Sequence, residues 1–199
     1  MLSFDQTEVS GLDYLHEPVG VLKESQDLLG ELYSSKKSYY LVNGSTVGNL
    51  AMIMGSTNKG DRVFVDRSCH QSVIHALELA ELHPVFLTPE LNEFDATPLG
   101  ISLPRLEEAF KLYPSVKALI VTYPTYDGMV YSLKELIDYA RKRKCLVLVD
   151  EAHGPHFTLG APFPTSALDL GADVVVQSAH KMLPSLTQTA YLHLGNHVS

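Results

Sequence analysis

Seven short apolar runs, most of them separated by segments with helical periodicity, constrain the fold of this chain. The runs start near residues 38, 62, 84, 117, 145, 173 and 189. Strands that are buried on both faces read as continuous apolar runs, and strands that alternate with helices form parallel sheets between two helical layers. We therefore predict an α/β fold with three layers, α/β/α, around a mostly parallel seven-stranded sheet.

Helical segments are expected at 20–33, 43–55, 67–82 after a short loop, 103–113 and 131–144. Residues 89–102 contain Pro and Gly and are expected to form a connecting loop. The last two apolar runs are joined by only about ten residues, near the lower limit for a parallel crossover, so the last strand is expected to be antiparallel. Residues 1–19 read as an irregular N-terminal segment and residues 20–199 as one domain.

Composition and charge narrow the classes of function. The 199 residues are 45% hydrophobic and 19% charged, enough for one substantial core. A net charge of −8, with no basic run longer than 141–144, argues against a nucleic-acid partner. No apolar run approaches the roughly 20 residues of a membrane span, and the acidic start MLSFDQTEVS does not resemble a signal peptide. Two distant cysteines, Cys69 and Cys145, favour free thiols and a cytoplasmic location.

Polar residues follow two of the apolar runs, in LVLVDEAHGPHF (146–157) and ADVVVQSAHKM (172–182). Ligands of open α/β sheets bind at the carboxyl ends of the strands. An aspartate after one strand and a lysine after another suit pyridoxal 5′-phosphate, which needs a Schiff-base lysine and a partner for its ring nitrogen. VLVDEAH also fits the magnesium-handling box of an NTPase. That alternative requires GxxxxGK[ST], and the chain contains no Gly-Lys dipeptide.

Two further segments lie at the same expected edge of the sheet. In LVNGSTVGNLAMIMG, a strand, a glycine turn and a helix follow one another, an arrangement that can hold a phosphate at the helix N-terminus. The alternative, favoured for this motif alone, is that Ser45 or Thr46 only caps the helix. His70 stands at a strand-to-helix junction, where it could stack on a heteroaromatic ring or simply be a polar boundary residue.

Six blocks in order make the chain resemble the Orn/Lys/Arg decarboxylase family, pyridoxal-phosphate enzymes of the aminotransferase-like (type I) fold. The blocks are FDQTEVSGLDYLHEPVGVLKESQ, LVNGSTVGNLAMI, DRSCHQSVIHALELA, TYPTYDG, LVDEAHGPHF and SAHKMLPSLTQTAYLH. Together they cover nearly the whole chain. The resemblance therefore implies the pyridoxal-phosphate-binding large domain of such an enzyme.

The resemblance implies catalytic roles for four residues. Lys181 corresponds to the Schiff-base lysine, and His180 to its neighbour near the phosphate or the substrate. Asp150 corresponds to the aspartate on the pyridinium nitrogen, and His70 to the residue stacked on one face of the ring. Ala152 would pack on the other face.

The remaining implied contacts are polar. Ser45 and Thr46 correspond to the phosphate loop, Ser178 would add a hydroxyl, and His153 would lie beside the cofactor. No metal ligand is assigned.

The resemblance implies a decarboxylase of lysine, arginine or ornithine, giving a polyamine or its precursor. Family members are homodimers or larger, with the active site at the subunit interface. They are also much longer, so the chain is expected to be a fragment that lacks the C-terminal small domain. The alternatives are aminotransfer or an aldolase-like reaction on the same fold, a non-catalytic module, and the NTPase. Three residues are candidates for sensing a cationic substrate side chain: Asp127, Glu151 and His156.

Overall fold

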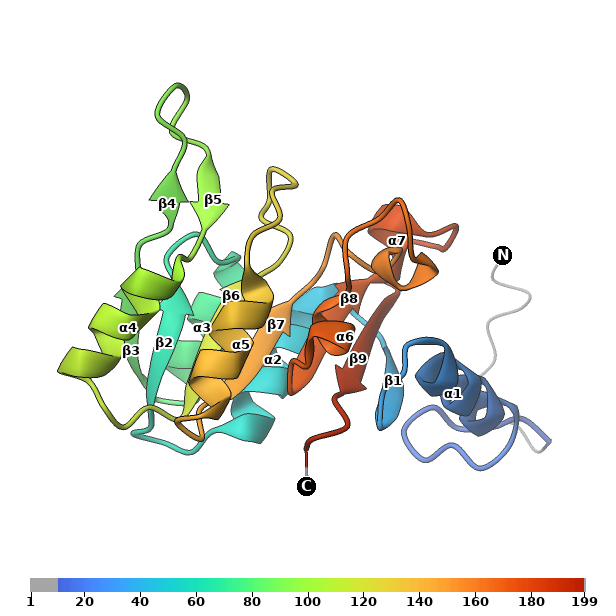
Figure 1. Ribbon diagram of the computed structural model, residues 1–199. Helices are drawn as coiled ribbons and strands as arrows, with labels where there is room; N and C mark the ends of the chain where they lie inside the picture. Colours follow the sequence, from blue (N-terminus) through green and yellow to red (C-terminus); the bar gives the residue numbers. More distant parts are fainter. Residues whose placement is uncertain (1–10, 199) are drawn as a thin grey trace.

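The computed structural model describes residues 11–198, and a seven-stranded sheet runs through its middle (Figure 1). The strand order is β1-β9-β8-β7-β6-β2-β3. The bounds are β1 (Lys37–Leu41), β2 (Arg62–Asp66), β3 (His83–Leu87), β6 (Ala118–Thr122), β7 (Leu146–Asp150), β8 (Val174–Ser178) and β9 (Ala190–Leu194). Each predicted apolar run forms one of these strands. β9 pairs antiparallel with both β8 and β1, while the other pairs are parallel, which confirms the expected direction of the last strand.

Five longer helices occupy the predicted segments. They are α1 (Val21–Leu32), α2 (Gly44–Ser56), α3 (Gln71–Leu79), α4 (Leu103–Leu112) and α5 (Leu133–Arg141). Three short elements were not predicted: the 3-10 turn η2 (Phe157–Leu159), α6 (Ala167–Leu170) and α7 (Ala179–Met182). Elements of three or four residues are too short to show helical periodicity, which explains why the sequence gives no sign of them.

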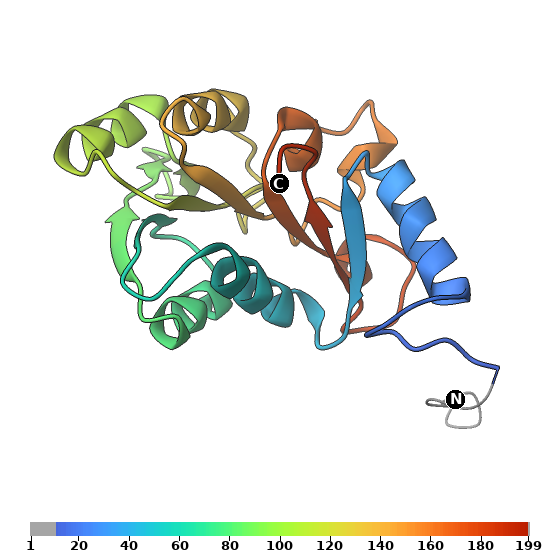
Figure 2. The same ribbon diagram turned by 90° about the horizontal axis from the view of Figure 1, so that it is seen from below.

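Helices cover both faces of the sheet, as Figure 2 shows from below. Alternate strand residues point to opposite faces. On β2, Phe64 packs in a core with side chains of α1, α4, α5 and α6. Val63 and Val65, its neighbours on the same strand, pack against α2 and α3. The three-layer prediction is therefore confirmed, and the same alternation decides which face each polar residue at the sheet edge reaches.

The segment 89–102 is more ordered than expected. It contains a small hairpin of β4 (Glu90–Leu91) and β5 (Pro98–Gly100), which projects past the end of the main sheet in Figure 1. The Asn92 carbonyl accepts the Ala96 N–H, and the Asn92 N–H donates to the Thr97 carbonyl, each at 2.9 Å. The loop prediction is wrong here because strands of two and three residues show no apolar alternation.

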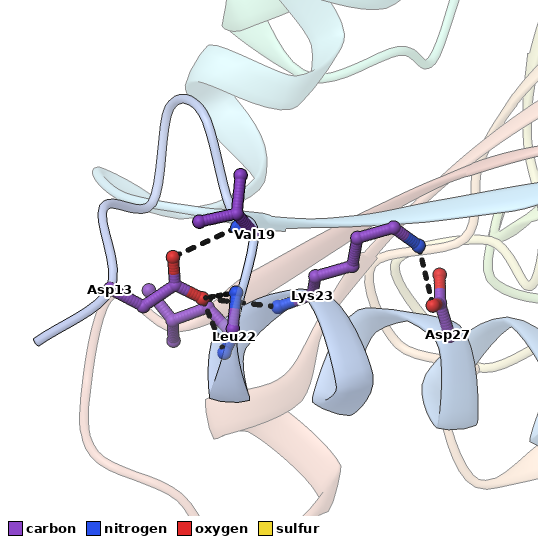
Figure 3. A network of polar contacts seen from close by, with 6 residues as sticks. Asp13, Val19, Leu22, Lys23 and Asp27 are labelled. Carbon is purple, nitrogen blue, oxygen red and sulfur yellow. Dashed lines mark hydrogen bonds and ion pairs between the residues drawn. The ribbon is translucent and has the colours of Figure 1, made fainter.

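A carboxylate organises the approach to α1 (Figure 3). Asp13 Oδ1 accepts the Val19 N–H at 2.9 Å, and Oδ2 accepts the N–H groups of Gly20 and Leu22 at 2.9 and 2.8 Å. The backbone donors lower the pKa of Asp13 to about 2. Asp13 therefore satisfies free N–H groups at the start of α1, where Gly20 has no side chain to do so. Residues 1–10 of the predicted irregular segment 1–19, and with them residues 4–10 of the first sequence block, lie outside the described residues.

Candidate functional site

A cavity of about 580 Å³ lies at the carboxyl ends of the parallel strands. We call it the edge cavity. Eight of the nine residues that the sequence assigned to the site line it: Ser45, Thr46, His70, Asp150, Ala152, His153, His180 and Lys181. The ninth, Ser178, does not line the cavity and is fully buried. The segments that carry these residues are far apart in the chain, and the parallel sheet brings them to one edge.

Asp150 ends β7 on the sheet face that α2 covers. Its side chain is 3% exposed. Asp150 Oδ2 accepts a hydrogen bond from Asn49 Nδ2 of α2 at 2.7 Å, and Oδ1 accepts the Ala152 N–H at 3.1 Å. Each carboxylate oxygen has a second lone pair, so the Asp150 carboxylate can accept a further N–H from a ligand in the edge cavity.

Asn49 also links Asp150 to His70. The second proton of Asn49 Nδ2 points to Ser72 Oγ at 2.9 Å, and Ser72 Oγ lies 2.9 Å from His70 Nδ1. The Ser72 N–H also donates to His70 Nδ1, at 3.2 Å, so His70 is the N-cap of α3. Because Ser72 Oγ accepts from Asn49, its own proton is free for His70 Nδ1. These bonds place the proton of a neutral His70 on Nε2 and fix the plane of its ring.

The start of α2 leaves its hydroxyl groups available. The N-cap is Asn43, in a left-handed conformation with φ 67° and without a side-chain capping bond. The interpretation of Ser45 or Thr46 as a helix cap is therefore wrong. Ser45 Oγ instead accepts a hydrogen bond from Ser178 Oγ at 2.8 Å, so Ser178 reaches the site through Ser45. Helix N-terminal N–H groups beside two hydroxyls form an anion-binding arrangement.

Lys181 lies on α7 with its Nζ 3.2 Å from His153 Nε2. Burial and the adjacent Lys181 ammonium lower the pKa of His153, so its neutral imidazole accepts a hydrogen bond from Lys181 Nζ. His180 Nδ1 lies 2.9 Å from the Thr189 carbonyl, which fixes its ring beside the lysine. The lysine nitrogen is therefore held at the cavity wall by a neutral partner.

Glu151 does not reach the edge cavity. Strand alternation sends its side chain to the opposite face from Asp150, where it is 0% exposed. Its carboxylate accepts from the Ala167 N–H at 2.7 Å, Ser166 Oγ at 3.2 Å and Gln177 Nε2 at 2.5 Å. Burial outweighs these donors and raises the pKa of Glu151 to about 8. The expectation that Glu151 senses a cationic substrate is wrong because no part of its side chain is accessible.

Sequence reasoning missed several residues of the site. Asn49 and Ser72 lie behind the cavity wall, and Cys69, Thr122 and Gln188 line it. Asn49 is the single polar side chain in the apolar run 47–54, and this was the one available signal. Gln188 gives no sequence signal, because only the return of the chain to β9 brings it next to Asn43, where its carbonyl accepts the Gly44 N–H.

Solved structures with the same fold define the class of protein. The chain superposes on lysine decarboxylase A from Pseudomonas aeruginosa with a TM-score of 0.75 and 25% identity, over 91% of this chain and 27% of that one. It also superposes on ureidoglycine–glyoxylate aminotransferase from Bacillus subtilis with a TM-score of 0.69 and 15% identity, over 88% of this chain and 44% of that one. The fold is thus one that a lysine decarboxylase and an aminotransferase share.

The sequence comparison narrows the class to a family. The chain belongs to the Orn/Lys/Arg decarboxylase family, whose major domain matches residues 1–199. It is 50% identical over 196 residues to the uncharacterised protein YaaO of Bacillus subtilis, covering 98% of this chain and 41% of that protein. It is 35% identical over 193 residues to an arginine decarboxylase of Halalkalibacterium halodurans, covering 97% of this chain and 39% of that protein. The chain thus spans about two-fifths of the length of these curated relatives.

Two further observations bear on the molecule around the site. Both cysteines are free, Cys145 buried and Cys69 partly so. Within residues 11–198, no helix is both long enough and apolar enough to cross a membrane.

Proposed function

We propose that this chain is the cofactor-binding core of a pyridoxal-phosphate-dependent decarboxylase that acts on a basic amino acid: lysine, arginine or ornithine. The observation that carries the proposal is the set of side chains that line the edge cavity. They include the amine of Lys181, the buried carboxylate of Asp150 and the hydroxyl groups at the start of α2. These groups match the aldehyde, the ring nitrogen and the phosphate of pyridoxal 5′-phosphate.

The residues of the edge cavity fit this cofactor. Asp150 keeps a free lone pair on each oxygen, and its buried charge would favour the protonated ring nitrogen. Ser45, Thr46 and the first N–H groups of α2 would hold the phosphate. His70, fixed by Ser72, would lie against the ring, with Ala152 on the opposite face. Lys181 would attach the cofactor covalently.

The cofactor, when bound, supplies a ring that accepts the electrons left at Cα when CO₂ departs. The chain's own residues provide orientation and protonation. His70 and Ala152 would fix the plane of the ring, so that the bond to be broken stands perpendicular to it. Asp150 would keep the proton on the ring nitrogen. His153 Nε2 lies within hydrogen-bond distance of Lys181 Nζ in the structure and is placed to exchange protons with it.

Covalent trapping tests the cofactor assignment. The chain is incubated with pyridoxal 5′-phosphate, reduced with borohydride and digested, and the modified residue is identified by mass spectrometry. We expect a single adduct at Lys181. Lys181→Ala should abolish it.

Lys111→Ala is the matched control, since Lys111 is another exposed lysine and lies on α4, away from the cavity. This variant should label at Lys181 as the wild type does. Labelling spread over surface lysines, or an adduct that survives Lys181→Ala, would exclude the proposed site.

Assays of the products distinguish the reactions that this fold supports. Release of CO₂ with the corresponding amine supports decarboxylation, whereas formation of a keto acid or an aldehyde would point to aminotransfer or an aldolase-like reaction. A bound cofactor without turnover would favour a non-catalytic module. We further propose a homodimer or larger assembly, which analytical ultracentrifugation would test, and a cytoplasmic location, which the two free cysteines support.

A further inference from the structure

A second cavity, of about 590 Å³, adjoins the edge cavity. We call it the side cavity. The two cavities have four lining residues in common: Pro124, Tyr126, His153 and Lys181. The Lys181 nitrogen, with its His153 partner, therefore stands at the boundary between them. A substrate that reacts at this position has the cofactor residues on one side and the side cavity on the other.

The walls of the side cavity are mostly apolar. Val130, Phe157, Pro164 and Met182 contribute aliphatic, aromatic and thioether surface. Such a surface suits a chain of methylene groups, because it removes them from water without any polar group left unpaired. The volume lies in the range of about 300–1,000 Å³ that is typical of small-molecule sites.

Besides the shared Tyr126, His153 and Lys181, one carboxylate and one imidazole interrupt this apolar surface. Asp127 lines the cavity and has no hydrogen bond or salt bridge to any residue in the part of the chain that the structure describes. Its loop is fixed by the buried Thr125, whose N–H donates to the Met129 carbonyl at 2.9 Å and whose carbonyl accepts the Gly128 N–H at 2.9 Å. The turn that carries Asp127 is therefore ordered, and its exposed carboxylate has no cation of its own within residues 11–198.

His156 contributes a polar atom that lacks a partner. Its Nδ1 is buried and makes no hydrogen bond within residues 11–198. The ring packs edge-on against Phe157 and Phe163, with centroids 4.8 and 4.7 Å away. Burial lowers the pKa of His156, which favours the neutral imidazole, and a neutral imidazole has one nitrogen that accepts an N–H.

We propose that the side cavity holds the side chain of the amino-acid substrate, with the methylene groups on its apolar wall and the terminal ammonium or guanidinium on Asp127. His156 would contribute ring surface to the wall beside this cation, because its Nδ1 is itself enclosed. The proposal rests on the proposed function, because it assumes that the substrate's amino group lies at Lys181. Of the three residues that the sequence offered for a cationic side chain, Glu151 is enclosed on the other face of the sheet, and Asp127 and His156 share this cavity.

The test compares substrates with and without the terminal charge. The chain is loaded with pyridoxal 5′-phosphate, and binding of L-lysine, L-arginine and L-norleucine is followed by rapid-mixing absorbance of the cofactor before turnover. We expect Asp127→Asn to weaken lysine and arginine at least about fivefold, which corresponds to an ion pair of about 1 kcal/mol. Norleucine, which lacks the charge, should bind as in the wild type. Asp127→Glu should restore most of the loss.

Glu93→Gln is the control, because Glu93 is an exposed acid on the β4–β5 hairpin and lines neither cavity. It should bind all three amino acids like the wild type. If Asp127→Asn changes lysine and norleucine equally, or changes neither, the side cavity is not the cation site, while a Lys181 adduct still supports the proposed function. If the wild type forms no Lys181 adduct, the proposed function fails, and this proposal fails with it.

Discussion

Asn49 connects the two residues assigned to the ring of the cofactor. Its amide is 1% exposed and donates one proton to Asp150 and the other to Ser72, which in turn bonds His70. A single buried amide thus orients both the carboxylate and the imidazole. Because the bond to Asp150 involves a charge, its loss is expected to cost more than that of a neutral hydrogen bond, about 1.5–3 kcal/mol.

Asn49→Leu tests this role while keeping the side-chain volume. The variant removes both donors, so Asp150 and Ser72 lose a partner and His70 is less well fixed. We expect the affinity for pyridoxal 5′-phosphate to fall about tenfold or more, as measured by absorbance titration. Asn58→Leu, at an exposed turn, is the control and should leave the affinity unchanged. An unchanged affinity in Asn49→Leu would show that Asp150 and His70 do not depend on this amide.

At the scale of elements, α2 is held unusually close to the sheet. A Cβ added at Gly48 would lie 2.6 Å from Val176 Cγ1 and 2.7 Å from Leu41 Cδ1, both well below contact distance. Val176 is fully buried and β-branched, so it cannot move aside easily. The close approach brings Ser45 to Ser178 and Asn49 to Asp150. Helix packing and site geometry therefore depend on the same glycine.

Gly48→Ala should destabilise the chain although alanine favours helices. Overpacking costs about 1–3 kcal/mol and the gain in helix propensity is about 1 kcal/mol, so we expect a net loss of up to about 2 kcal/mol in the free energy of unfolding. Chemical denaturation measures it. Gly55→Ala is the matched control on the same helix, where an added Cβ meets nothing within 4 Å, and it should be neutral or stabilising. Equal stability of the two variants would contradict this account of the packing.

At the scale of the whole molecule, a series of buried, hydrogen-bonded side chains crosses the face of the sheet opposite the site. Glu151 binds Gln177, Gln177 Oε1 lies 3.1 Å from His193 Nε2, and His193 Nδ1 lies 2.7 Å from Ser38 Oγ. These hydrogen bonds therefore link the residue that follows β7 to side chains of β8, β9 and β1. Burial raises the pKa of Glu151 to about 8 and lowers that of His193 to about 3, so both side chains are neutral at pH 7.

These two pKa shifts give stability a defined dependence on pH. Relative to the unfolded chain, the folded chain binds an extra proton at Glu151 between pH 4.5 and 8, so stability falls as the pH rises through that range. His193 acts in the opposite direction, but only between pH 3 and 6.5. From pH 6.5 to 8 the Glu151 effect acts without that opposition. We expect it to lower the free energy of unfolding by about 2 kcal/mol in that interval.

Glu151→Gln should remove this decline, because glutamine does not ionise. Denaturation curves of the variant and the wild type between pH 6.5 and 8 measure the difference. Glu108→Gln, which removes an exposed acid of α4, should follow the wild type. A wild-type slope that persists in Glu151→Gln would assign it to other groups.

The sequence by itself determined the sheet and the long helices, and it predicted eight of the residues that line the edge cavity. Apolar runs such as 145–149 can be recognised because burial on both faces demands them. Asp150 directly follows such a run, and Lys181 stands three residues after the end of another. The antiparallel last strand followed from the short connection that precedes it. These features are local or depend on chain length, so one sequence suffices to predict them.

Only the tertiary structure decided which polar groups meet. Asp150 and Glu151 are neighbours in the chain, yet strand alternation sends one to the edge cavity beside α2 and encloses the other beneath α6. Asn49, 101 residues before Asp150, contacts it only because Gly48 allows α2 to lie close to the sheet. Asp127 and His156 share a cavity because two loops leave adjacent strands at the same edge. Contacts between distant segments depend on the packing distance between elements and on the direction of side chains. The local pattern of residues predicts neither.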